Sequence, residues 1–208
     1  MEIIFATGNQ HKMVEIRRIL DGLTLGGEDV QIYSLKDKGI DADIVEDGTT
    51  FLENATIKAK EIAKLVPGAL VMADDSGLEV DFINKEPGIY SARYMGEDTP
   101  YHEKNMNIIE RLKDARDVER SARFVCAIAT VLPNGELISA VETMEGRIAY
   151  EERGKNGFGY DPIFLVPPYD ETSAELTEDG KNAISHRGKA LRATRKKLEA
   201  YFENISCK

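Results

Sequence analysis

The sequence is poor in cysteine and has no long apolar run. Only two of its 208 residues are cysteine, Cys126 and Cys207, which is too few for a disulfide framework and shows no zinc-binding spacing. No apolar run is long enough to span a membrane, and the chain does not open with a basic segment followed by an apolar stretch. These absences predict a protein of the reducing cytoplasm.

Positive charge is also scarce. The chain has 27 Lys and Arg against 37 Asp and Glu, a formal net charge of -10. An acidic surface repels phosphate backbones and anionic lipids, so we expect neither a nucleic-acid polymer nor a membrane as a partner. Hydrophobic residues make up 42%, which together with the absence of repeats and linkers indicates a single globular domain over residues 1–208.

An apolar run of strand length, residues 70–73, is followed at once by Asp74, Asp75, Ser76 and Gly77. We expect the strand to end there and to present the two carboxylates at the edge of a cleft. Adjacent carboxylates repel each other unless a cation, a lysine or water compensates them. An ordinary acidic turn after a strand is the alternative.

A similar junction opens the chain. Residues 2–6 predict a buried strand, residues 7–12 a polar glycine loop, and the apolar spacing from Met13 to Leu20 a helix. Backbone N–H groups and the positive end of a helix dipole at such a loop suit a phosphate, and Lys12 adds a point charge. No P-loop motif occurs, so an ordinary strand-to-helix turn is equally compatible with this stretch.

Three further regions carry candidate polar groups. Thr50 and Glu53 have capping-box spacing, so a helix should begin near Phe51, with Asn54 and Lys58 on one face and Glu46 just ahead of it. Residues 154–164 form a second glycine-rich loop, whose aromatics either stack on a flat base or anchor the loop in the core. Lys181, His186 and Arg187 lie in a loop at a predicted helix start, where they can donate to an anion or a base edge.

Residues 122–132 predict the strongest strand, and residues 133–135 a hairpin that returns as an antiparallel strand, so the sheet should be mixed. Three loops able to face a phosphate or a base, together with carboxylates able to hold Mg²⁺, favour a nucleotide hydrolase. A nucleotide-binding sensor without turnover is one alternative. A phosphomonoesterase with an aspartate nucleophile is another.

Six motifs, at residues 7–12, 46–55, 73–78, 87–94, 157–162 and 184–188, span nearly the whole chain. In these motifs and their order the sequence resembles the inosine/xanthosine triphosphate pyrophosphatase family, which removes non-standard purine nucleotides. The resemblance implies an α/β fold with a long central mixed sheet flanked by helices, and two lobes around a substrate cleft. It also implies a homodimer that hydrolyses ITP, dITP and XTP to the monophosphate and pyrophosphate with Mg²⁺, keeping these nucleotides out of DNA and RNA.

The resemblance also assigns roles to individual residues. Glu46 and Asp75 would hold the metal, and Asp75 would act as general base, supported by Asp74 and Lys58. The residues that it predicts to bind substrate are Thr7, Gly8, Asn9, Gln10, His11, Lys12, Ser76, Phe158, Gly159, Tyr160, Asp161, Lys181, His186 and Arg187, the first six at the triphosphate and the last two near the base.

Overall fold

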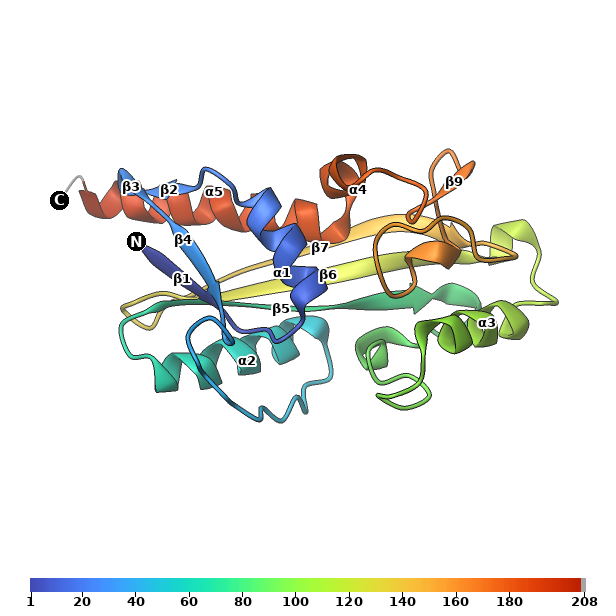
Figure 1. Ribbon diagram of the computed structural model, residues 1–208, viewed down its shortest axis with the longest axis horizontal. Helices are drawn as coiled ribbons and strands as arrows, with labels where there is room; N and C mark the ends of the chain where they lie inside the picture. Colours follow the sequence, from blue (N-terminus) through green and yellow to red (C-terminus); the bar gives the residue numbers. More distant parts are fainter. Residues whose placement is uncertain (207–208) are drawn as a thin grey trace. The chain divides into compact units, whose positions relative to one another are not determined.

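The computed structural model describes residues 1–206 as an α/β protein built on a seven-stranded sheet (Figure 1). The strand order is β4-β1-β5-β6-β7-β8-β9, and β2 and β3 form a separate pair. The strands are β1 (Glu2–Phe5), β2 (Thr24–Leu25), β3 (Glu28–Asp29), β4 (Gln31–Ser34), β5 (Leu70–Val80), β6 (Ser121–Val131), β7 (Leu137–Ile148), β8 (Phe164–Val166) and β9 (Glu171–Thr172). The α-helices are α1 (Gln10–Ile19), α2 (Phe51–Leu65), α3 (Tyr101–Arg111), α4 (Glu178–Ile184) and α5 (His186–Ser206).

The predicted mixed sheet is confirmed. β1 pairs in parallel with both β4 and β5, whereas β8 pairs antiparallel with both β7 and β9. The predicted hairpin between β6 and β7 is closed by the Leu132 N–H, which donates to the Glu136 carbonyl at 2.8 Å. In the part of the chain that the structure describes, no helix is both long enough and apolar enough to cross a membrane.

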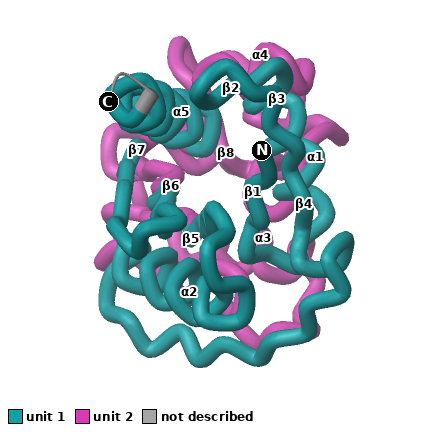
Figure 2. The backbone as a smooth tube through the Cα atoms, turned by 90° about the vertical axis from the view of Figure 1, so that its left-hand side faces the viewer, with its two compact units in different colours: residues 1–75, 126–142, 187–208 teal, residues 76–125, 143–186 magenta. Residues whose placement is uncertain are grey.

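The chain divides into two compact units, each with its own apolar core (Figure 2). Unit 1 consists of residues 1–75 and 126–142 and of the chain from Arg187 onward, and unit 2 of residues 76–125 and 143–186. β5, β6 and β7 each contribute residues to both units. The single domain and the substrate cleft expected from the sequence stay predictions.

Within unit 1, helices cover both faces of the sheet. α1 and α5 lie on one face and α2 on the other (Figure 1). α2 buries the apolar side chains of Phe51, Ala55, Ala59 and Ile62. Its capping box is also confirmed: the Glu53 N–H donates to Thr50 Oγ1 and the Thr50 N–H to Glu53 Oε2, both at 3.1 Å.

β5 does not end at Ala73, so both the predicted end of the strand and the alternative of an acidic turn there are wrong. The strand continues through Asp74 and Asp75 to Val80. Glycine is required at position 77 because other atoms lie close to it, and not because the chain turns there. A Cβ would lie 2.3 Å from Ser91 Oγ and 2.5 Å from the Gly88 carbonyl oxygen.

Two predicted loops are shorter than expected. α1 begins at Gln10, because Asn9 caps it by accepting the Lys12 N–H at 3.2 Å, so Gln10, His11 and Lys12 are helical. His186 and Arg187 are likewise the first residues of α5, and Lys181 lies within α4, so none of these three residues lies in a loop. Cys207 lies outside the described residues.

Gly77→Ala should destabilise unit 2, because its methyl group would collide with the Gly88 carbonyl and the Ser91 side chain. Overpacking of this kind costs about 1–3 kcal/mol of unfolding free energy, measurable by urea denaturation. Stability equal to that of the parent for Gly77→Ala would contradict the close approach.

Candidate active site

Asp74 and Asp75 are neighbours on β5, and successive side chains of a strand point to opposite faces of the sheet. Asp74 accordingly contacts residues of α1 and α5, whereas Asp75 contacts residues of α2. These helices lie on the two opposite faces (Figure 1). The aspartate pair therefore forms two separate charge clusters.

The Asp74 cluster is a buried network of two carboxylates and two cations. Arg187 donates Nε and Nη2 to Asp74 Oδ2, both at 3.0 Å, and Lys12 Nζ lies 2.7 Å from Asp74 Oδ1. Arg187 also donates Nη1 to Glu15 Oε2 at 2.6 Å. The side chains of Asp74 and Arg187 are 0% and 2% exposed, so this network joins β5, α1 and α5 away from water.

The network keeps Asp74 ionised. Burial opposes its charge, but Lys12 and Arg187 outweigh burial and hold the pKa of Asp74 well below its usual value. The buried Cys126 thiol, whose Sγ lies 3.8 Å from Asp74 Oδ2, has a raised pKa, chiefly because of burial. Asp74 is therefore a fixed negative charge that is unsuited to take up a proton.

The Asp75 cluster is built on α2. Asn54 donates Nδ2 to Asp75 Oδ2 at 3.3 Å, and its own Oδ1 accepts the Gly48 N–H at 2.9 Å. Lys58, one turn further along α2, places Nζ 2.8 Å from Glu46 Oε2 and 3.7 Å from Asp75 Oδ1. The predicted face with Asn54 and Lys58 thus meets both Glu46 and Asp75.

Asp75 differs from Asp74 in its electrostatic surroundings. Burial raises the pKa of Asp75, and the negative charges of Glu46 and Asp74 add to this against the opposing Lys58 and Lys12. The pKa of Lys58 is raised, because Asp75 and Glu46 outweigh the effect of its burial. The surroundings thus lower the pKa of Asp74 and raise the pKa of Asp75. Adjacent carboxylates whose pKa values are shifted in opposite directions are typical of acid–base sites.

Glu46 and Asp75 fit a divalent cation. Among residues 1–206, no group of three or more His, Cys, Asp and Glu side chains is gathered to form a cage of protein ligands only. Mg²⁺ does not require one, because it is usually held by one or two carboxylates together with waters and substrate phosphates. Two carboxylates that share one ammonium group have the charge and the hard oxygen atoms for such a site.

The predicted triphosphate residues surround the N-terminus of α1. Thr7 Oγ1 accepts the Asn9 N–H at 3.1 Å, and Gln10 Nε2 donates to the Gly8 carbonyl at 3.5 Å. A Cβ at Gly8 would meet nothing within 4 Å, so the approach to this backbone is open. His11 is exposed, and Lys12 is held by Asp74. A helix N-terminus with no acidic residue in its first turn suits an anion.

In unit 2 the structure brings Phe158, Asp161 and Lys181 together. Asp161 Oδ2 accepts the Phe158 N–H at 2.8 Å and pairs with Lys181 Nζ at 2.6 Å, and both charged side chains are buried. The Lys181 ammonium lies 4.9 Å from the centre of the Phe158 ring. The predicted loop is thus tied to α4 by a buried ion pair.

The remaining predicted residues lie as follows. The His186 ring stacks on Phe124, with the ring centres 4.9 Å apart, and is 5% exposed. Ser76 is half-buried on β5. Sequence reasoning missed Glu15 as a partner of Arg187, although it lies three residues after Lys12 on α1, and gave little weight to Asn54.

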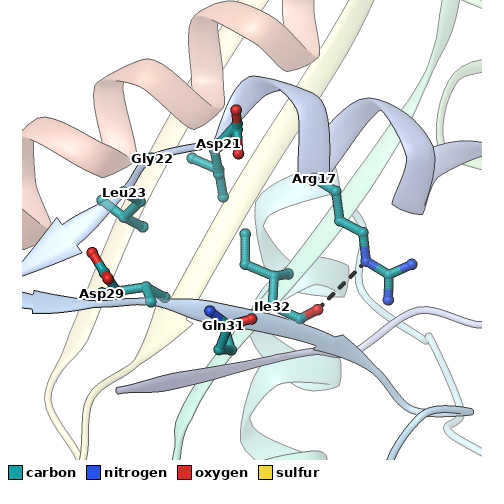
Figure 3. A pocket seen from close by; sticks show the side chains of 9 residues that line it. Arg17, Asp21, Gly22, Leu23, Asp29, Gln31 and Ile32 are labelled. Carbon is teal, nitrogen blue, oxygen red and sulfur yellow. Dashed lines mark hydrogen bonds between the residues drawn. The ribbon is translucent and has the colours of Figure 1, made fainter.

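A cavity of about 450 Å³ lies elsewhere in unit 1, between the end of α1 and β4 (Figure 3). Arg17 on its wall donates Nε to the Ile32 carbonyl at 3.4 Å and forms an ion pair with Asp37. None of the predicted site residues lines this cavity, so we do not assign the candidate active site to it.

Comparison with known proteins agrees with these features. The Ham1 family model matches residues 3–197. The dITP/XTP pyrophosphatase of Clostridium perfringens is 47% identical over 207 residues, covering 97% of this chain and 99% of the relative, and that of Exiguobacterium sibiricum is 48% identical, covering 96% of each. The solved structure of the Staphylococcus aureus Ham1 protein matches with a TM-score of 0.84 and 39% identity over 97% of this chain and all of that one. The chain belongs to the Ham1 family.

Arg187→Met should strongly destabilise the protein, because it leaves the buried Asp74 without its guanidinium partner. Breaking one side of a buried ion pair costs about 3–5 kcal/mol, measurable by urea denaturation. Arg195→Met is the matched control on the same helix, since its pair with Glu199 is about one-third exposed and should contribute at most about 1 kcal/mol. Equal losses for the two variants would refute the structural role of the Arg187 pair.

Proposed function

We propose that this chain hydrolyses non-standard purine nucleoside triphosphates, of the type ITP, dITP and XTP, to the nucleoside monophosphate and pyrophosphate. The observation that carries the proposal is the meeting of Glu46, Lys58 and Asp75, beside an Asp74 that is neutralised separately. Membership of the Ham1 family and relatives named dITP/XTP pyrophosphatase support the choice of substrate.

Residues of unit 1 would perform the phosphate chemistry. The α1 N-terminus and Lys12 bind the triphosphate and stabilise the charge that develops on the leaving pyrophosphate. Asp75 accepts the proton of the attacking water as it adds to the α-phosphorus, and Lys58 and Asn54 hold its carboxylate in place. Asp74 supports this site indirectly by positioning Lys12.

Glu46 and Asp75 would hold Mg²⁺. Ham1-family pyrophosphatases are generally metal-dependent, and hard carboxylate oxygens suit magnesium. When bound, the ion supplies Lewis-acid stabilisation of phosphate charge. Lys58 already supplies one positive charge to the two carboxylates, so it can orient them before the ion arrives.

Residues 158–161 and Lys181 in unit 2, with Ser76, His186 and Arg187, would bind the rest of the substrate, including its base. A 6-oxo purine presents an acceptor where adenine presents an amino donor, so protein donors at that position select against ATP. Each unsatisfied buried donor costs roughly 1–3 kcal/mol, so a few contacts suffice for strong rejection.

We further propose a cytoplasmic homodimer that binds neither a nucleic-acid polymer nor a membrane. The net charge of -10 and the scarcity of cysteine support the location and the lack of polyanionic partners. The dimer rests on the family resemblance.

Asp75→Asn should reduce pyrophosphate release by at least about a hundredfold, because the amide cannot accept the proton of water. The fold should survive, since the amide oxygen can still accept the Asn54 hydrogen bond. Asp98→Asn, at an exposed turn, is the matched control and should turn over like the parent. Near-parental activity of a folded Asp75→Asn variant would remove Asp75 as base and ligand.

A panel of ITP, dITP, XTP, GTP and ATP with Mg²⁺, scored separately for pyrophosphate and orthophosphate, tests the reaction itself. We expect pyrophosphate from the first three nucleotides and little product from ATP. A chelator should abolish turnover, and Mg²⁺ should restore it. Orthophosphate as the product would instead indicate a phosphomonoesterase, and binding without turnover a sensor.

A further inference from the structure

The loop of residues 157–161 is held by a second set of contacts, which come from α3 in the same unit. Asn105 donates Nδ2 to Glu152 Oε1 at 2.7 Å and to the Gly159 carbonyl at 3.3 Å, and it is 1% exposed. Tyr101, one helical turn earlier, packs edge-on against Tyr160 with ring centres 5.3 Å apart. α3 therefore contacts both the backbone and a side chain of this loop.

The partners of Asn105 determine how its amide is oriented. Both partners are acceptors, so the NH₂ group must face them, and a flipped amide would place its oxygen against a carboxylate and a carbonyl. Asn105 Oδ1 is buried and accepts no hydrogen bond within residues 1–206. Within the described residues, the side chain of Asn105 therefore hydrogen-bonds to Glu152 and Gly159 alone.

The contact to Gly159 lies at a position where the loop backbone is unusual. Gly159 has a φ of +69°, in the left-handed region, and the Tyr101 ring lies 3.5 Å from where its Cβ would be. The neighbouring residues are fixed separately, because Tyr160 donates its hydroxyl to the Ser91 carbonyl at 2.7 Å and Asp161 pairs with Lys181. Asn105 is the side chain that donates to the Gly159 peptide between the two aromatics.

We propose that Asn105 is a positioning residue for the nucleobase: by holding the Gly159 carbonyl, it sets the orientation of the neighbouring Phe158 towards the base. The inference rests on the proposed function, which assigns this loop to the substrate. The hydrogen bonds of Asn105 go to residues of unit 2, whereas the α1 N-terminus and the Asp75 cluster belong to unit 1. Its effect should therefore fall on binding of the base and not on phosphate chemistry.

Asn105→Asp tests this with almost no change in size. The carboxylate would face the Glu152 carboxylate and the Gly159 carbonyl, so both hydrogen bonds would be replaced by repulsion. We expect the KM for ITP to rise about tenfold while kcat changes by less than about twofold. Inhibition by inosine monophosphate should weaken to a similar extent, and inhibition by pyrophosphate should not change.

Two further variants separate positioning from stability. Asn107→Asp is the matched control on α3. Among residues 1–206, Asn107 forms its side-chain hydrogen bond through Oδ1, which accepts the Tyr94 hydroxyl at 2.8 Å and is retained in the variant. Asn105→Asp combined with Glu152→Gln exchanges donor and acceptor. The amide introduced at position 152 can donate to the carboxylate introduced on α3, while the Gly159 carbonyl stays unpaired. We expect the double variant to recover the melting temperature but to keep the raised KM.

The inference is overturned if the KM of Asn105→Asp stays within about twofold of the parent, or if the double variant restores KM together with the melting temperature. If Asn105→Asp alone does not fold, the double variant makes the same comparison with the parent. Absence of ITP turnover in both the parent and Asn107→Asp would instead be a failure of the proposed function.

Discussion

The buried ion pair between Arg187 and Asp74 is the interaction on which the organisation of unit 1 depends most. It joins residues 113 positions apart in the sequence and, through Glu15 and Lys12, fixes α1 and α5 to the same point of β5. Two cations and two carboxylates balance in charge, so the cluster is tolerable in a dry environment only when complete. The need for all four charged groups therefore determines how α1, β5 and α5 meet.

The same cluster determines what each aspartate can do. Because strand geometry sends Asp74 and Asp75 to opposite faces, Arg187 neutralises one and leaves the other to Lys58, Asn54 and Glu46. A fixed anion on one face positions Lys12, and a carboxylate with a raised pKa on the other is suited to proton transfer and metal binding. The two units are also built alike in one respect, since Lys181 and Asp161 form a comparable buried pair in unit 2.

Local rules predicted much of this structure. The capping box at Thr50, the strand–loop–helix opening and the hairpin after β6 depend on residues close in sequence, and each is present. The strand ending at Ala73 was wrong, because a run of Asp-Asp-Ser-Gly favours a turn locally and only pairing with distant cations lets it remain a strand. Arg187 illustrates the same limit: its partners on α1 and β5 are not visible in its own neighbourhood.

The sequence by itself determined the family motifs, the residue types of the candidate site and most helix and strand positions, because periodicity and caps act over a few residues. Only the tertiary structure decided that Asp74 and Asp75 belong to different clusters and that Asn105 supports the Gly159 peptide. These features depend on which faces and helices meet, and burial then sets the charge state of each carboxylate.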